Sequence, residues 1–180
     1  MRMRVVPSVG VVLVLLAWGL PGASPVPRTD AQPRIVVYFS PHGGAEDAVV
    51  RVLRGARRQV LVAIYDLTDD RIAGALVDAA HRHVDTRVIM DAREARTRWS
   101  QYGVLASALG SRLVLRSGVG NPHAIMHDKF AVIDGSVVLT GSFNWTRLAE
   151  CCNHENLLVI EDRALAREFA REFSRIWNAP

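Results

Sequence analysis

The sequence predicts a mixed α/β domain whose mostly parallel β-sheet is flanked by helices on both faces. Short runs rich in valine, isoleucine and leucine alternate with segments whose apolar residues recur at helical spacing, as where Gln59–Tyr65 is followed by Asp69–His83. A helix between two strands is the usual connection between parallel neighbours. Later in the chain two strand patterns are joined directly by Asp134-Gly135-Ser136, a typical hairpin turn, which makes the sheet mixed.

The expected elements follow one another in chain order. Strands are predicted at Arg34–Ser40, Gln59–Tyr65, Arg87–Met90, Arg112–Leu115, His127–Ile133, Val137–Ser142 and Asn156–Ile160. Helices are predicted at Ala45–Arg58, Asp69–His83 and Arg93–Leu109, and in a last segment that Asp162 caps. These elements form one domain over residues 33–180.

The N-terminal segment is expected to lie outside this domain. Arg2 and Arg4 precede the apolar run Val9–Leu20, and a proline-rich stretch of small residues follows it. That order is typical of an export signal, so residues 1–31 are interpreted as a signal peptide and linker, and the protein as periplasmic or secreted. The apolar run is short for a membrane span. The alternative is an uncleaved signal that tethers the domain to a membrane.

Charge and cysteine content narrow the classes of function. The net charge is +4 and would fall to +2 without residues 1–31, which is compatible with a polyanionic substrate but excludes an arginine-rich nucleic-acid coat. The only cysteines, Cys151 and Cys152, are adjacent, and neighbouring cysteines rarely pair without strain. We therefore expect no conventional intrachain disulfide. Two free thiols and a bridge between two copies of the chain both stay open.

A cluster of phosphate-binding side chains is predicted around the hairpin. His127 and Lys129 are two apart in a strand and so project from the same face, and the returning strand brings Ser142 and Asn144 toward them. An imidazole, an ammonium, a hydroxyl and a carboxamide then suit a phosphate that is held by donors and attacked by a neutral imidazole. Of the 22 cationic side chains only Lys129 is a lysine, and a compact ammonium with rotating donors explains that choice.

The same residues resemble a known family signature. The pattern is similar to the motif of the phospholipase D superfamily, and here it is His127-x-Lys129-x4-Asp134-x6-Gly141-Ser142-x-Asn144. The likeness is strongest toward the Nuc-like branch of small exported bacterial nucleases, which act on DNA and RNA. A mitochondrial member described both as a cardiolipin hydrolase and as a nuclease is also similar. The resemblance implies a phospholipase D/nuclease-like fold.

The resemblance also implies a role for each matched residue. His127 would be the catalytic nucleophile, and Lys129 and Asn144 would bind the non-bridging phosphate oxygens. Ser142 would line the same phosphate-binding pocket. Glu155 would hydrogen-bond the histidine and set its tautomer as a further catalytic residue.

Asp134 is carried over from the motif as a catalytic residue too. It lies on the opposite strand parity from His127, at a turn position that favours aspartate for local reasons, so a structural role is the open alternative. No cofactor is implied and no metal is expected, because three or more metal ligands do not converge near the motif. The only carboxylates close to it in sequence are Asp128 and Asp134.

A single copy of the motif predicts two chains. In-line displacement needs a nucleophile on one side of phosphorus and a proton donor for the leaving oxygen on the other. Because Lys129 is the only lysine, the chain cannot contain a second His-x-Lys motif to supply that donor. We expect a homodimer sharing one active site, with His127 from each subunit facing one phosphate. One imidazole would be neutral and the other protonated, which predicts a bell-shaped pH dependence.

The leading interpretation is a metal-independent phosphodiesterase that hydrolyses DNA and RNA through a phosphohistidine intermediate. Segments that can flank the pocket and contact neighbouring phosphates contain Arg96, Arg98, Arg116 and Arg147. The alternative is a phospholipase D that acts on membrane phospholipids, phosphatidylcholine or cardiolipin, because the same groups serve either diester. A non-catalytic phosphate-binding or nucleic-acid-binding module is a weaker alternative, because a protein that only binds phosphate does not need His127, Lys129, Asn144 and Glu155 together.

Overall fold

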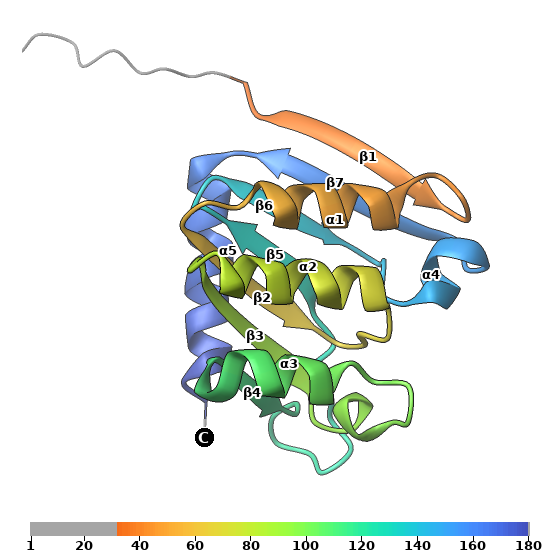
Figure 1. The fold of residues 1–180 in the computed structure, drawn as a ribbon, viewed down its shortest axis with the longest axis vertical. Coiled ribbons are helices and arrows are strands. Elements are labelled where there is room, and N and C mark those ends of the chain that lie inside the picture. The colour runs from red at the N-terminus through yellow and green to blue at the C-terminus, as the bar shows by residue number, and fades with distance from the viewer. Residues whose placement is uncertain (1–31, 180) are drawn as a thin grey trace, which may run out of the picture. The chain divides into compact units, whose positions relative to one another are not determined.

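The computed structural model describes residues 32–179, so the predicted signal segment 1–31 lies outside the described residues. A seven-stranded sheet with the order β1-β7-β6-β5-β2-β3-β4 runs through this part of the chain (Figure 1). The strands are β1 (Arg34–Ser40), β2 (Gln59–Ile64), β3 (Asp85–Asp91), β4 (Leu113–Arg116), β5 (Lys129–Ile133), β6 (Val137–Gly141) and β7 (Glu155–Glu161). Each coincides with a predicted strand to within two residues.

The sheet combines parallel and antiparallel pairs, which confirms the predicted mixed sheet. β2 pairs in parallel with β3, and β3 with β4. The other four neighbouring pairs are antiparallel, so the expectation of a mostly parallel sheet is wrong. The reason is that β5, β6 and β7 insert between β1 and β2, whereas the sequence pattern alone suggests that β1 and β2 are neighbours.

Helices cover both faces of the sheet, as predicted. α1 (Ala45–Gly55), α2 (Asp70–His81) and α3 (Tyr102–Leu109) pack on one face, and α5 (Arg163–Trp177) packs on the other (Figure 1). Asp162 caps α5 by accepting hydrogen bonds from two amides of its first turn. In the described part of the chain, none of the helices has the length and apolar character needed to span a bilayer.

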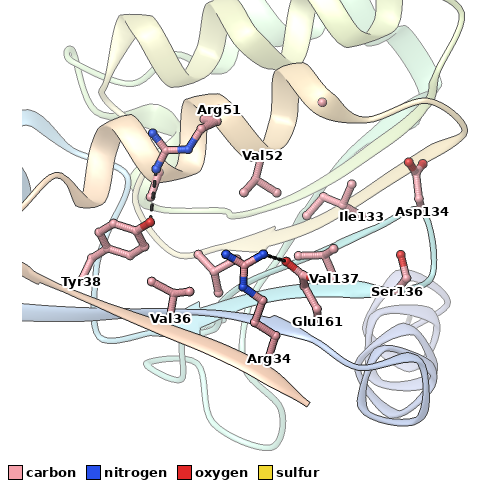
Figure 2. Close-up of a pocket in the computed structure, with 13 residues that line it drawn as sticks. Arg34, Val36, Tyr38, Arg51, Val52, Ile133, Asp134, Ser136, Val137 and Glu161 are labelled. Carbon is pink, nitrogen blue, oxygen red and sulfur yellow. Dashed lines mark hydrogen bonds and ion pairs between the residues drawn. The ribbon is translucent and has the colours of Figure 1, made fainter. Parts of the chain in front are cut away.

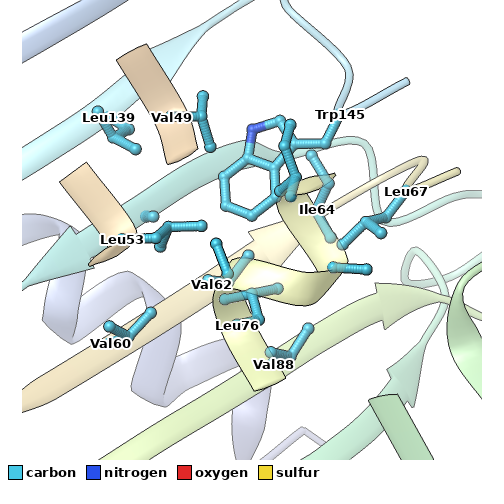
Figure 3. Packing of buried hydrophobic residues seen from close by; sticks show 14 of the residues in the cluster. Val49, Leu53, Val60, Val62, Ile64, Leu67, Leu76, Val88, Leu139 and Trp145 are labelled. Atoms are coloured by element: carbon cyan, nitrogen blue, oxygen red, sulfur yellow. The ribbon is translucent and has the colours of Figure 1, made fainter. Parts of the chain in front are cut away.

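The larger of the two cores anchors the loop that follows β6. Trp145 in that loop is only 1% exposed and packs among Val49, Leu53 and Leu76 (Figure 3). Truncating a buried tryptophan costs about 3–5 kcal/mol in typical proteins. The neighbouring residue Asn144 is therefore attached to one of the most firmly held points of the fold.

The segment after β3 differs from the prediction. The expected helix Arg93–Leu109 is a single 3-10 turn (Glu94–Arg96) followed by α3 alone. The buried carboxylate of Asp91 accepts hydrogen bonds from the Arg93 and Glu94 amides, at 2.8 and 3.2 Å. Thr97 then returns the backbone to an extended conformation. A side chain that binds backbone amides in this way competes with helix formation.

A short helix and a disulfide were not expected between β6 and β7. α4 (Arg147–Cys151) begins after Thr146, whose hydroxyl accepts a hydrogen bond from the Ala149 amide at 3.1 Å. A disulfide joins Cys151 to Cys152, so the expectation of no intrachain disulfide is wrong. The disulfide lies at the C-terminal end of this helix, whose last residue is Cys151.

Asp134 is a turn residue, and its prediction as a catalytic residue is wrong. It adopts a positive φ of 52° at the β5–β6 turn. Its carboxylate accepts hydrogen bonds from the amides of Arg57 (3.0 Å), Arg58 (2.8 Å) and Gln59 (3.0 Å). Burial alone would raise its pKa, but these three amides outweigh burial and hold the pKa of Asp134 below its ordinary value.

Asp134 also lies at a different cavity from the other motif residues. Figure 2 shows it beside Ser136, at the end of β5 that is opposite the end where Lys129 stands. Charged side chains in this 390 Å³ cavity are already paired, since Arg34 contacts Glu161 at 3.4 Å and Arg51 donates to the Tyr38 hydroxyl at 3.2 Å. Asp134 therefore connects the hairpin to the start of β2.

The structural role of Asp134 predicts a loss of stability without a loss of chemistry. Asp134→Ala should lower the free energy of unfolding by about 2–3 kcal/mol, because three amides lose a charged acceptor. Asp134→Asn, which keeps one acceptor and tolerates a positive φ, should lose less. Urea titration followed by circular dichroism measures both. Normal stability with abolished turnover in Asp134→Ala would restore a catalytic role.

Candidate active site

A pocket opens at the end of the sheet where β5 and β7 begin and β6 ends. His127, Lys129, Ser142, Asn144 and Glu155 all line this cavity of about 610 Å³. The chain thus brings together five of the six residues that the sequence predicts for the site. Because alternation along β5 and the return of the hairpin both lead to this end, the convergence follows from the local strand pattern. The chemical roles of the five residues stay predictions.

The position of the imidazole depends on how β5 begins. His127 precedes the first residue of β5 and is exposed, so the strand starts two residues later than predicted. The Tyr65 amide donates a hydrogen bond to the Asp128 carbonyl oxygen at 2.8 Å. This bond extends the β2–β5 pairing one step beyond the Ile64–Lys129 pair. His127 therefore keeps a strand-like relation to Lys129 although it lies outside the strand.

Tyr65 contacts both predicted catalytic side chains, and sequence reasoning missed it. Its ring meets the His127 imidazole edge-to-face, with 4.6 Å between centroids, and the Lys129 ammonium lies 5.0 Å from the ring centroid. The Tyr65 hydroxyl donates to a carboxylate oxygen of Glu94 at 3.0 Å. The strand pattern identifies Tyr65 as a strand end, but only the β2–β5 register shows what it touches.

Lys129 sits in an acidic surrounding. Burial lowers its pKa, and the nearby carboxylates of Asp128, Glu155 and Asp66 act in the opposite direction. Its ammonium donates a hydrogen bond to the His127 carbonyl oxygen at 2.8 Å. Burial, with a contribution from Glu94, raises the pKa of Asp66 to about 6. The pocket of one chain therefore places several carboxyl groups around a single ammonium.

Gly141 and Ser142 explain the Gly-Ser pair of the motif. Gly141 has a φ of 150°, and a Cβ atom there would lie 2.2 Å from the Asn156 carbonyl oxygen, so only glycine fits between β6 and β7. The Ser142 hydroxyl oxygen accepts hydrogen bonds from the Asn156 amide (3.1 Å) and from its side chain (3.3 Å). Its own proton stays available to donate toward the pocket.

Glu155 and Asn144 both line the pocket. Glu155 accepts a hydrogen bond from the Asn153 side chain at 3.3 Å, and within residues 32–179 it forms none with His127. The hydrogen bond predicted between Glu155 and the histidine is therefore not formed within one chain, and the role of Glu155 stays a prediction. The side-chain oxygen of Asn144 is buried without a hydrogen-bond partner in the described structure. An unpaired acceptor at this position can be satisfied by a donor group of a ligand or by water.

The arginines predicted near the pocket divide into two groups. Arg96, Arg98 and Arg147 are exposed on segments at the pocket end of the sheet. Arg116 instead donates a hydrogen bond to the Ile176 carbonyl oxygen at 3.0 Å, so it binds the end of α5 and its predicted contact with substrate is wrong. Across residues 32–179, His, Cys, Asp and Glu side chains form no group of three or more placed to hold a metal ion.

Comparison with known proteins gives consistent matches. The family model described as "Cardiolipin synthase, PLD-like domain" matches residues 49–177. A mitochondrial cardiolipin hydrolase from Xenopus laevis is 38% identical over 130 residues, which cover 70% of this chain and 58% of that protein. A phospholipase D from Rickettsia prowazekii is 32% identical over 138 residues, which cover 76% of this chain and 65% of that protein. The chain thus spans between half and two thirds of the length of each of these two relatives.

A solved structure matches over a larger share of its length. It is a phospholipase D family member, Nuc, from Salmonella typhimurium. The two chains are 33% identical with a TM-score of 0.71, and the match covers 82% of this chain and 95% of that one. The predicted phospholipase D/nuclease-like fold is therefore confirmed.

The contacts of Tyr65 predict that its ring, rather than its hydroxyl, supports turnover. Tyr65→Leu should lower kcat about 10- to 100-fold with little change in KM, because misplaced reacting groups lose orientation. Tyr65→Phe keeps the ring beside His127 and Lys129 and should stay within a few-fold of the parent. Steady-state kinetics with a phosphodiester substrate distinguishes the two. Equal kcat for the leucine and phenylalanine variants would contradict the prediction.

The raised pKa of Asp66 predicts a pH-dependent stability. Between its unfolded value near 4 and its folded value of about 6, the folded chain binds the proton more tightly, so this residue lowers stability as pH rises through that window. Asp66→Asn should therefore raise the free energy of unfolding at pH 7.5 and match the parent near pH 4. Urea titrations at both pH values test this, with exposed Asp78→Asn as the control. A gain at pH 4 equal to that at pH 7.5 would contradict it.

Proposed function

Because the chain belongs to the phospholipase D superfamily, we propose that it hydrolyses phosphodiester bonds through a covalent phosphohistidine at His127. The observation that supports this mechanism is the shared pocket of His127, Lys129, Ser142 and Asn144. The imidazole is exposed to that pocket, and three side-chain donors surround the volume in which a phosphate would lie. No metal or cofactor takes part in the proposed steps.

The reaction proceeds in two displacements. A neutral ring nitrogen of His127 forms a bond to phosphorus while the bond from phosphorus to the leaving oxygen breaks, and a second imidazole donates its proton to that oxygen. Water then attacks phosphorus, the second imidazole takes a proton from it, and the phosphorus–nitrogen bond breaks to release His127. Lys129, Asn144 and Ser142 donate to the non-bridging oxygens in both steps.

The second imidazole comes from a second copy of the chain. In one copy, Lys129 is the only ammonium or guanidinium among the described residues lining the pocket, while Asp128 and Glu155 line it as carboxylates. One ammonium beside two carboxylates neutralises the negative charge of a phosphodiester poorly. A protonated imidazole from a partner would supply both the missing charge and the missing proton.

An apolar strip on β1 offers a surface for that second copy. Ile35, Val37 and Phe39 are 52%, 46% and 64% exposed and alternate along the edge strand, so they share one face. Phe39 lies opposite Asn156 on the neighbouring strand β7. The Asn156 amide donates a hydrogen bond to the Ser142 hydroxyl oxygen in the pocket. The strip therefore runs along the sheet edge to the rim of the pocket, and exposed apolar strips of this kind mark interfaces.

The dimer predicts that one charge on the strip abolishes both assembly and turnover. Val37→Asp should convert a sedimenting dimer into a monomer and lower turnover by at least about 100-fold, because the general acid is lost. Val104→Asp, at a valine of similar exposure on α3, is the matched control and should stay dimeric. Sedimentation velocity and a nicking assay measure the two effects. A Val37→Asp monomer with full activity would exclude the shared site.

Nucleic acid is the proposed substrate. The match to Nuc covers nearly the whole of that protein, whereas the matches to the cardiolipin hydrolase and the phospholipase D cover only part of each. The mildly positive net charge is compatible with a polyanion. The signal-like pattern of residues 1–31 favours action in the periplasm or outside the cell.

A phospholipid is the second candidate substrate. The names of the two curated relatives support it, and so do large apolar side chains that are exposed at the pocket end of the sheet. The catalytic groups would be the same, because both substrates are phosphodiesters. The choice therefore depends on assays rather than on the pocket chemistry.

Nicking of plasmid DNA in the presence of EDTA tests the function. We expect the parent to cut and His127→Ala, with an unchanged circular dichroism spectrum, to lose activity by about 1,000-fold or more, because the nucleophile is removed. His81→Ala, at an exposed histidine on α2, is the matched control. Parallel assays with phosphatidylcholine and cardiolipin vesicles distinguish the candidates. Activity that needs added divalent ions would contradict the mechanism.

A further inference from the structure

Exposed apolar side chains gather at the pocket end of the sheet. Apart from those on β1, the large apolar residues that are exposed within residues 32–179 are Trp99 (65%), Tyr102 (36%), Val104 (52%), Val119 (84%) and Leu148 (65%). They belong to segments that follow β3, β4 and β6. Because β3 and β4 run parallel to β2, and β5 is antiparallel to β2, these segments lie at the end where the pocket opens (Figure 1).

The loops after β3 and β4 are held in place by hydrogen bonds. The Arg93 guanidinium donates to the Pro122 carbonyl oxygen at 2.7 Å, and the Gln101 amide donates to the Leu67 carbonyl oxygen at 3.0 Å. Gly118 approaches Ala124 so closely that a Cβ atom would lie 2.4 Å from the Ala124 side chain. Trp99 and Val119 are thus displayed on attached loops rather than on free segments.

The loop after β3 is basic. Residues 92–101 contain three arginines (Arg93, Arg96 and Arg98) and one acidic residue, Glu94, which accepts a hydrogen bond from the Tyr65 hydroxyl. Arg96 and Arg98 are exposed, and the Arg98 guanidinium lies 4.2 Å from the centroid of the Trp99 ring. Exposed apolar tips beside arginines are complementary to a surface that carries phosphate anions above an apolar layer.

We propose that this end of the sheet, defined by Trp99, Tyr102, Val119 and Leu148 with Arg96 and Arg98, docks on an anionic lipid bilayer. Trp99 and Tyr102 would lie at the headgroup level, Val119 and Leu148 would enter the acyl boundary, and the arginines would pair with lipid phosphates. Single-stranded nucleic acid fits less well, because only Trp99 and Tyr102 offer rings on which a base can stack, while Val119 and Leu148 are exposed at 84% and 65% and would find no apolar partner. Docking does not depend on which diester the pocket hydrolyses, and it brings the pocket to the membrane surface.

Tryptophan fluorescence of the full chain with vesicles tests the docking. The protein carries His127→Ala so that the lipid is not consumed, and Trp99→Phe on the same background identifies the signal of Trp99. Vesicles of phosphatidylcholine mixed with phosphatidylglycerol should shift the Trp99 emission to the blue, and vesicles of phosphatidylcholine alone should shift it less. Arg96→Glu with Arg98→Glu should weaken binding to the anionic vesicles about 10-fold or more.

Two controls separate this surface from other membrane contacts. Arg163→Glu with Arg167→Glu, the same change of charge at two exposed arginines of α5, should bind like the parent, and any binding through residues 1–31 should be equal in all variants. An unchanged Trp99 emission with anionic vesicles would overturn the proposal. A Trp99 response to a single-stranded oligonucleotide without one to vesicles would assign the surface to nucleic acid instead. Neither outcome depends on turnover, so the proposed hydrolysis is tested separately.

Discussion

The hydrogen bond from the Tyr65 amide to the Asp128 carbonyl is the constraint on which the pocket depends. It is the last step of the β2–β5 pairing in the middle of the sheet. A slip of one residue in this register would turn His127 and Lys129 to the opposite face and separate both from the Tyr65 ring. The register is secured by burial, since all residues of β5 after Lys129 are buried and alternate between the two cores.

Two buried groups carry this constraint into the loops around the pocket. The Asp91 carboxylate accepts hydrogen bonds from the amides of Glu94 (3.2 Å) and Met126 (2.9 Å), so it joins the loop that supports Tyr65 to the residue before His127. Trp145 holds the end of the hairpin in the larger core next to Asn144. Both groups are remote from the proposed chemistry, yet each determines where a pocket side chain stands.

Local sequence patterns predict the elements and most of the pocket, but not the long-range pairing. The alternation of apolar residues identifies every strand, and the spacing of His127 and Lys129 predicts their shared pocket. Periodicity says nothing about which strands become neighbours, so the insertion of β5, β6 and β7 was not foreseen. Asp134 illustrates the same limit: motif spacing groups it with His127, whereas the length of β5 places it at the other end of the sheet. Arg116 and Tyr65 could be placed only from contacts with residues distant in sequence.

The stereochemical outcome at phosphorus is the most direct measurement of the proposed chemistry. Two successive displacements, first by His127 and then by water, each invert the phosphorus centre, so the product must retain the configuration of the substrate. A phosphorothioate diester that is chiral at phosphorus, hydrolysed in ¹⁸O-labelled water, reports this directly. Retention is the predicted result. Inversion would show that water attacks the substrate in a single step and would contradict the phosphohistidine mechanism.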